Sequence, residues 1–433
     1  MSLKPYCEYK DSNIQWLSTV PSHWEVNKIG RISQFTVGWT PPTGIQENFE
    51  GDNRWANISD LGPRIIYDTA KRVSDNAVEA SRLKPSPRGS LLFGFKLSVG
   101  DVSFAGTEMY TNEAIATFFE SVHVTLRYAY YAYPIFIVEN ASENIYNARI
   151  LNQERIRNAK IAFPHTEEQR EIADFLDRET AEIDAFIVDQ ERLIELLEER
   201  RTATITQVLE KTSNETDHIR LRYVAEINPS IPASVRKSTG LDVTFLAMES
   251  IYELGGFDRS KTRPIEEVNS GYSYFEDNDV IYAKVTPCFE NGKAAVINDL
   301  PHAFGFGTTE ITVLRTKPTV EARYLLYNLL EDRFRQFGKA AMTGAGGLKR
   351  VPETFAKDFY FPLPQPSEQQ VIADFLDREL AEIDAAVADA REVIGLLRER
   401  RAALISAAVT GQIDVTQQAR SVVDQSMDNE VWV

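Results

Sequence analysis

Apolar residues recur at alternating steps of about three and four along two stretches of the chain, residues 168–201 and 368–401. A mean spacing near 3.5 residues is typical of a coiled-coil seam. The pattern therefore predicts two long helices, each burying one apolar stripe against another helix. The positions assigned to these stripes are Ile172, Leu176, Ile183, Phe186, Leu193 and Leu197 in the first stretch, and Ile372, Leu376, Ile383, Val387, Ile394 and Leu397 in the second.

The two stretches are copies of one another. Glu168–Arg201 and Glu368–Arg401 are identical at 22 of 34 positions at a constant offset of 200 residues. Each helix of about 40 residues would be roughly 60 Å long, more than one domain needs for its own core. Because the nearest complementary surface is the other copy, we expect an antiparallel pair. Thr180 and Gln190 replace the second copy's Leu380 and Ala390, so the pairing is only quasi-symmetric.

Both helices carry signals at their ends. Thr166 with Gln169, and Ser367 with Gln370, have the spacing of a capping box. The second helix is expected to stop at Thr410-Gly411, because glycine readily takes the left-handed conformation that follows a helix.

The remaining sequence has short apolar runs broken by Gly, Pro, Asn and Asp, which predicts compact α/β domains. Residues 219–228, IRLRYVAEIN, resemble residues 27–35, NKIGRISQF, so the domain is repeated as well as the helix. The predicted fold is mixed α+β, with two similar α/β domains separated by two long antiparallel helices in a pseudo-twofold repeat. The expected segments are a first domain with an N-terminal arm (1–165), a helix (166–215), a second domain (216–365), a helix (366–415) and a polar tail (416–433).

Charge is distributed unevenly over these segments. The net charge of -17 argues at first against nucleic acid, because Lys and Arg must neutralise phosphates. Yet residues 1–165 hold 17 basic and 17 acidic side chains, and residues 216–365 hold 18 and 19. The excess of acidic residues lies in the stretches that contain the helices, with 6 basic against 15 acidic residues in 166–215 and 6 against 13 in 366–433. DNA binding, if present, belongs to the near-neutral domains.

The two cysteines and the longest apolar run indicate the cellular compartment of the protein. Cys7 and Cys288 stand far apart and outside any metal-binding spacing, so a reducing cytoplasm fits the chain. The longest apolar run, Tyr128–Val138, is too short to span a bilayer and is expected to be a buried element rather than a membrane anchor.

Motifs for catalysis are missing from the sequence. The segment TGAGGLKR (343–350) has glycines and Lys349 but lacks the GK[ST] of a phosphate-binding loop. The histidines form no H-E-x-x-H arrangement, and no G-x-S-x-G elbow occurs. We therefore expect no catalytic residue and no metal site, and we interpret the helix carboxylates, such as Asp174 and Asp177, as a solvated face.

Basic and aromatic side chains interleave in both near-neutral domains. Together they could contact phosphates and base edges, although each alone could equally be a solubilising surface residue. The candidate DNA-binding residues are Trp39, Arg54, Lys71, Arg72, Arg82, Lys84 and Arg88 in the first domain, and Arg236, Lys237, Arg259, Lys261, Arg263, Tyr272, Tyr274, Lys284, Lys293, Lys349 and Arg350 in the second.

The chain resembles the specificity subunit of type I restriction-modification systems in several segments and in the order in which they occur. They are YKDSNIQWL followed by PSHWEV near the N-terminus, FPHTEEQREIADFLD (163–177), FPLPQPSEQQVIADFLD (361–377) and AVTGQIDV (408–415). The resemblance covers nearly the whole length.

The resemblance implies a non-enzymatic reader of double-stranded DNA. Residues 1–165 and 216–365 would be target recognition domains, each reading one half of a split target. The helices would set their separation and dock two modification (methyltransferase) subunits. S-adenosylmethionine, ATP and magnesium would then belong to the modification and restriction subunits, and no cofactor to this chain.

Two other hypotheses remain open from the residues alone. The coiled-coil repeats and the acidity also fit a structural adaptor that binds only proteins, without DNA recognition. An unrecognised nuclease or methyltransferase site in one domain is the enzymatic alternative.

Overall fold

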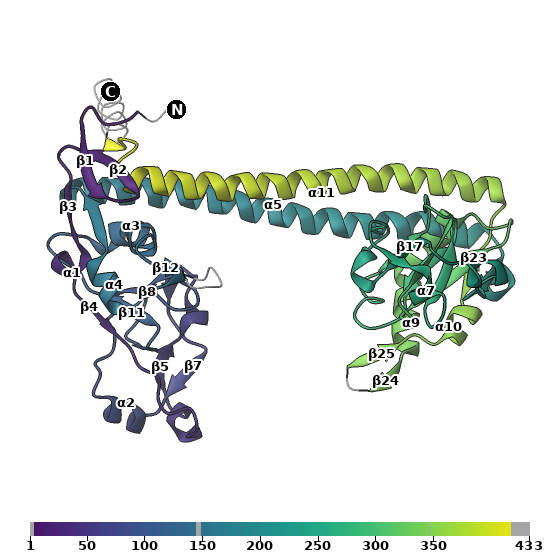
Figure 1. Cartoon of the computed structure of the whole chain (residues 1–433), viewed down its shortest axis with the longest axis horizontal. Coiled ribbons are helices and arrows are strands. Elements are labelled where there is room, and N and C mark those ends of the chain that lie inside the picture. Colours follow the sequence, from purple (N-terminus) through teal and green to yellow (C-terminus); the bar gives the residue numbers. More distant parts are fainter. Residues whose placement is uncertain (1–3, 144–148, 346, 417–433) are drawn as a thin grey trace, which may run out of the picture. The chain divides into compact units, whose positions relative to one another are not determined.

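The computed structural model describes residues 4–143, 149–345 and 347–416. Its chain divides into two compact units, one of residues 1–189 with 394–433, the other of residues 190–393. Two long helices, α5 (Thr166–Glu215) and α11 (Pro366–Val409), each contribute to both units. The predicted mixed fold with two long helices is confirmed (Figure 1). The predicted polar tail lies outside the described residues, apart from Thr416.

The first unit is built around a five-stranded sheet with the order β4-β11-β8-β9-β6, antiparallel except for the parallel pair of β6 and β9. Its strands are β1 (Tyr9–Ile14), β2 (Leu17–Pro21), β3 (Glu25–Lys28), β4 (Phe35–Val37), β5 (Asn53–Ala56), β6 (Ile65–Ile66), β7 (Lys71–Val73), β8 (Leu91–Gly94), β9 (Val102–Ala105), β10 (Tyr110–Thr111), β11 (Ile115–Phe118), β12 (Ser142–Glu143), β13 (Arg149–Ile150) and β14 (Lys160–Phe163). Its shorter helices are α1 (Ile29–Ile32), α2 (Asp75–Ser81), α3 (Leu126–Val138) and α4 (Gln153–Asn158).

Helix α3 supplies much of the core of this unit. It coincides with the long apolar run of the sequence, and the side chain of Thr125 caps its first turn by accepting from the Tyr128 amide. Tyr128, Tyr133 and Phe136 are at most 1% exposed and belong to one core with residues of β8 and β11. The run is therefore a buried element, as predicted.

The second unit has two four-stranded sheets, β16-β23-β20-β21 and β18-β17-β22-β19. Its strands are β15 (His218–Arg220), β16 (Ala225–Ile227), β17 (Asp242–Leu246), β18 (Thr262–Pro264), β19 (Ser273–Glu276), β20 (Val280–Ala283), β21 (Ala294–Val296), β22 (Phe304–Gly307), β23 (Ile311–Thr316), β24 (Thr343–Ala345), β25 (Leu348–Arg350) and β26 (Tyr360–Pro362). Its shorter helices are α6 (Ala233–Arg236), α7 (Ile265–Val268), α8 (Ala322–Leu330), α9 (Asp332–Ala341) and α10 (Glu353–Asp358).

The long helices pair antiparallel within each unit. In the first unit Arg401 Nη2 of α11 donates to Asp184 Oδ2 of α5 at 3.2 Å. In the second unit the repeat-related Arg201 of α5 donates to Asp384 of α11. The same ion pair thus occurs twice with the helices exchanged, as the pseudo-twofold repeat requires.

The seam predicted for α11 is confirmed in its central part. Leu376, Ile383, Val387 and Ile394 are all at most 9% exposed, and Leu380 and Ala390 complete the heptads between them. Leu397 is half-buried, and so is Ile372, which packs on the core of the second unit.

The seam predicted for α5 is wrong at two positions. Phe186 is 47% and Leu193 is 41% exposed, whereas the adjacent Ile187 and Ile194 are half-buried. Both sites present two successive apolar residues, so periodicity alone did not separate the buried one. The other predicted positions, Ile172, Leu176, Ile183 and Leu197, are buried or half-buried, with Ile172 and Leu176 in the core of the first unit.

A buried glutamine holds the start of each long helix against its domain. Gln169 accepts from the Thr125 amide (2.8 Å) and donates to the His123 and Pro164 carbonyls (2.7 and 2.9 Å). Gln369 does the same in the second unit, with the Glu321 amide (2.9 Å) and the Thr319 and Pro364 carbonyls (3.0 and 2.8 Å).

The predicted capping boxes are therefore wrong. Gln169 satisfies buried backbone groups before α3 instead of capping its own helix. Gln370, the second predicted capping residue, is exposed and reaches Asp374 at 3.3 Å. Buried backbone groups that lack water need a partner more than a solvated first helical turn does.

An ion-pair cluster beside each glutamine is also duplicated. Asp177 accepts from Arg127 and, at 2.6 Å, from the Tyr131 hydroxyl, while Asp377 accepts from Arg323 and Tyr327. Burial raises the pKa of Asp177, but hydrogen bonds from Arg127, Tyr131 and Arg64 outweigh it and hold the pKa below its ordinary value. The carboxylate is therefore charged at neutral pH and fixes α3 on α5, so the interpretation of the helix carboxylates as a solvated face is wrong for Asp177.

Replacing Gln369 by alanine should lower the free energy of unfolding by about 3 kcal/mol, since each buried polar group left without a partner costs about 1–3 kcal/mol. Gln369 is fully buried. Urea unfolding of the full chain measures the change. Gln370→Ala, one residue away on the exposed face, is the control and should change stability by less than about 0.5 kcal/mol. Equal effects from the two variants would show that Gln369 does not hold the start of α11 against its domain.

The C-terminal end of α11 returns to the N-terminal arm, which folds as the hairpin β1–β2 (Figure 1). Gly411 adopts the left-handed conformation expected after the helix, with φ of 72°. Its carbonyl accepts from the Tyr9 hydroxyl at 2.9 Å, and a Cβ there would lie 2.3 Å from Pro21. Asp414 then donates its amide to the Lys4 carbonyl at 2.8 Å, so both ends of the described chain belong to the first unit.

Candidate nucleic-acid interface

A pocket of about 290 Å³ opens in the first unit beside the end of β4. Its lining includes residues 36–39, residues 82–87, Tyr110 and Thr111. The Trp39 ring meets the Tyr110 ring edge-on with centroids 6.1 Å apart, and the Trp39 carbonyl accepts from the Trp55 indole at 2.9 Å. These contacts fix an aromatic wall.

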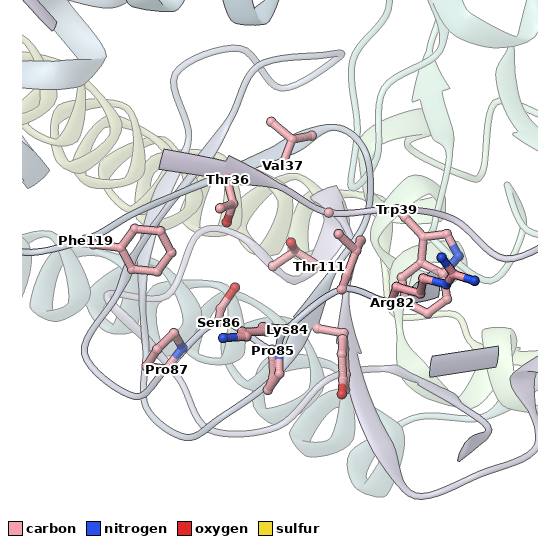
Figure 2. Close-up of a pocket in the computed structure, with 13 residues that line it drawn as sticks. Thr36, Val37, Trp39, Arg82, Lys84, Pro85, Ser86, Pro87, Thr111 and Phe119 are labelled. Carbon is pink, nitrogen blue, oxygen red and sulfur yellow. The ribbon is translucent and has the colours of Figure 1, made fainter. Parts of the chain in front are cut away.

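Two of the predicted cations border this wall. Arg82 ends α2 in the left-handed conformation (φ 57°), and Lys84 follows two residues later; both are exposed. Figure 2 shows Arg82 at the same end of the pocket as Trp39, with Phe119 at the other end. An aromatic face bordered by cations suits a stacked base and its phosphate. The structure thus brings together Trp39, Arg82 and Lys84.

Arg54 and Arg72 form a second group in the first unit. They lie opposite one another on the paired strands β5 and β7, and both contact Asp68, at 3.3 and 2.5 Å. The hydrogen bond from Arg72 holds the pKa of Asp68 below its ordinary value. Lys71 and Arg88, the other two candidates, are exposed.

The second unit has a matching pocket of about 340 Å³ beside the end of β16. Residues 228–231, directly after β16, line this pocket, as residues 36–39 at the end of β4 line the first. Lys284 and Tyr272 lie at this pocket, and the Tyr272 ring stands edge-on to Phe245 at 5.1 Å. Tyr274 forms part of the wall but is buried, and its hydroxyl donates to Glu276 at 2.5 Å.

Other candidates of the second unit lie outside this pocket. Arg236 and Lys237 are exposed at the end of α6. Arg263 stacks on Phe245, 4.1 Å from the ring centroid. Arg259 and Lys261 are exposed and pair with Asp299 and Glu249, at 3.2 and 3.0 Å.

Lys293 is set apart from the others. Its Nζ donates to the Met248 carbonyl at 3.1 Å, and it lines a pocket with Arg201 and Asp384 of the long helices. The structure therefore does not bring Lys293 to the pocket of Lys284. Lys349 and Arg350 are exposed on β25, where Arg350 pairs with Glu310.

Sequence reasoning overlooked several lining residues, among them Tyr110, Thr111 and Asn228. Tyr110 and Thr111 form the two-residue strand β10 and Asn228 follows β16, and neither periodicity nor charge distinguishes them. The repeat itself could have identified Asn228, because this residue ends the segment that repeats residues 27–35.

Among the described residues, no three His, Cys, Asp or Glu side chains gather in a way that could hold a metal ion. Over the same residues, no helix combines the length and apolar character needed to cross a membrane.

Comparisons with known proteins give the family. The family model described as "Type I restriction modification DNA specificity domain" matches residues 21–193 and again residues 216–387. The chain is similar to the specificity subunits of the type I restriction enzymes EcoAI (33% identity over 213 residues) and EcoEI (36% over 155 residues) of Escherichia coli. These alignments cover 48% and 35% of this chain but only 34% and 25% of the relatives' lengths.

A solved structure shares the fold. The chain is similar to one from a structural study of complex assembly and conformational transition of the type I R-M system, with a TM-score of 0.64 at 15% identity. The likeness covers 91% of this chain and 99% of that one. Since the family model matches well over half of the chain, in two copies, the chain belongs to the type I restriction-modification DNA specificity family.

Proposed function

We propose that the chain is the non-catalytic specificity subunit of a type I restriction-modification enzyme. Residues 1–165 read one half of a bipartite DNA target and residues 216–365 read the other. The observation that carries this proposal is a pocket at the end of β4 in one near-neutral domain and at the end of β16 in the other, with a different lining in each. Two sites with different linings suit two half-targets of different sequence.

The lining side chains support reading of bases rather than general affinity for DNA. The first pocket offers indole and phenol rings with two cations, and the second offers Tyr272 and Lys284. Phosphates are contacted by any exposed cation, whereas base edges are distinguished by groups fixed in position. The ring contacts of Trp39 and Tyr272 provide that fixation.

The long helices set the separation of the two domains and dock two modification subunits in this proposal. Their acidity disfavours phosphates, and α5 leaves Leu193 and Leu196 exposed at 41% and 45%. Apolar side chains on a long charged helix suit a protein partner. S-adenosylmethionine, ATP and magnesium enter with the modification and restriction subunits, and the complex works on DNA in the cytoplasm.

Competition binding tests the proposal. The full chain, co-expressed with the methyltransferase subunits of its own system, should retain a target duplex against excess competitor DNA. The logarithm of the binding constant should fall linearly with the logarithm of salt concentration, since each neutralised phosphate releases counterions. A complex that assembles yet retains no duplex selectively would instead favour the adaptor hypothesis.

A further inference from the structure

The strands β24 and β25 form an exposed two-stranded ribbon that projects from the body of the second unit (Figure 1). Leu348, Lys349 and Arg350 of β25 are all exposed. The major groove of B-DNA is wide enough to admit a ribbon of this kind.

The base of the ribbon is fixed to the loop after β20. The Lys349 amide donates to the Thr286 hydroxyl, and the Thr286 amide donates to the Lys349 carbonyl, both at 3.0 Å. Val285 and Arg350 form a β-bridge, and the Val351 amide donates to the Lys284 carbonyl at 2.8 Å. The backbone of Arg350 therefore has a fixed position beside Lys284, which lines the second pocket.

The side chain of Arg350 is oriented by one carboxylate. Its Nε donates to Glu310 Oε2 at 2.8 Å, and its Nη2 donates to Glu310 Oε1 at 2.7 Å. This bidentate pairing uses one edge of the planar guanidinium and leaves the end edge, with Nη1 and the second Nη2 hydrogen, for another planar acceptor. Among the described residues, Arg350 has no partner at Nη1.

Stability alone does not explain this pair. The Arg350 and Glu310 side chains are 45% and 27% exposed, and exposed ion pairs add little to stability. An acidic residue beside a ribbon that meets DNA would also repel phosphates. The hydrogen bond from Arg350 holds the pKa of Glu310 below its ordinary value, so the carboxylate is charged and keeps the arginine in one orientation.

We propose that Arg350, oriented by Glu310, reads a guanine in the half of the target bound by residues 216–365. The inference rests on the proposed function and deepens it. Two parallel N–H groups of an arginine match O6 and N7 of guanine in the major groove, which is the commonest specific protein–DNA contact. Arg350 is then a specificity-determining residue, and Glu310 is its positioning residue.

The first unit has an alanine at the position that corresponds to Glu310. The Lys284 amide donates to the carbonyl of Glu310, and in the first unit the Phe95 amide donates to the carbonyl of Ala114. Alanine thus occupies the place of Glu310 in strand register. The proposed contact therefore affects only one half of the target.

The test compares methylated motifs made by the full chain with its methyltransferase subunits. Arg350→Ala removes both donors, so discrimination for one guanine in one half-site should fall by about 5- to 150-fold. Glu310→Gln should relax the same position less. Lys349→Ala, the neighbouring cation on the same strand, is the control. It should weaken binding evenly across sequences and lower the salt slope by about one, as loss of a phosphate contact does.

A modified duplex identifies the contact without relying on the fold of a variant. Replacing the assigned guanine by 7-deazaguanine removes the N7 acceptor, so it should weaken binding of the wild-type complex but not of the Arg350→Ala complex. An unchanged motif in Arg350→Ala, or the same 7-deazaguanine penalty in both complexes, overturns the inference. If the wild-type complex produces no split motif at all, the proposed function fails instead.

Discussion

Replacing Leu376 by alanine is expected to lower the free energy of unfolding of the chain by about 3–5 kcal/mol. Leu376 is fully buried at the start of the α11 seam, in one core with Leu221, Tyr324 and Phe361. The cost combines lost burial with a cavity that a helix fixed by Gln369 cannot close. Chemical unfolding followed by near-ultraviolet circular dichroism measures it.

Two comparisons make this prediction specific. Leu176, the repeat-related leucine, is equally buried in the core of the first unit, so Leu176→Ala should have a similar cost. Leu396→Ala, at a position that is 59% exposed on the same helix as Leu376, should cost less than about 0.5 kcal/mol. If Leu376→Ala were as mild as Leu396→Ala, α11 would not be held by this seam.

Replacing Leu193 and Leu196 together by aspartate is expected to weaken assembly with the modification subunits by about 100-fold or more. Burying one leucine contributes about 1.5–3 kcal/mol, so losing two from an interface accounts for that factor before any cost of burying the charges. The fold should survive, because both side chains are already exposed and lie beside the seam, which uses Ile194 and Leu197 instead. Analytical ultracentrifugation of the co-expressed subunits measures assembly.

The control is Val122→Asp, which introduces one charge at an exposed apolar residue that precedes α3 and is not part of α5. Assembly should be unaffected. Normal assembly of the double leucine variant would show that the modification subunits dock elsewhere.

The sequence predicted the architecture well because repetition and periodicity are properties of whole segments. Twenty-two identities in 34 positions at one offset identified both helices, and their exchange-related pairs Arg401–Asp184 and Arg201–Asp384 follow from the same repeat. The failures are local. At Leu193-Ile194 two adjacent apolar residues compete for one buried position, and only packing decides between them.

The candidate interface was less predictable. Charge and aromatic content identified Trp39, Arg82 and Lys84, which meet at one pocket, but also Lys293, which lies beside the long helices. The partners that orient these side chains come from distant segments, as Glu310 does for Arg350 across 40 residues. Residue type alone does not give such pairings. The roles of the individual residues in DNA binding remain predictions.

A methylation map of a hybrid subunit tests the central claim most directly. Residues 1–165 are replaced by the corresponding recognition domain of a type I system with a known target, and methylated sites are mapped across a genome. The account predicts a split motif in which the half assigned to residues 1–165 changes to that of the donor, while the other half stays the same. A hybrid that assembles and methylates with both halves changed, or with neither changed, would contradict it.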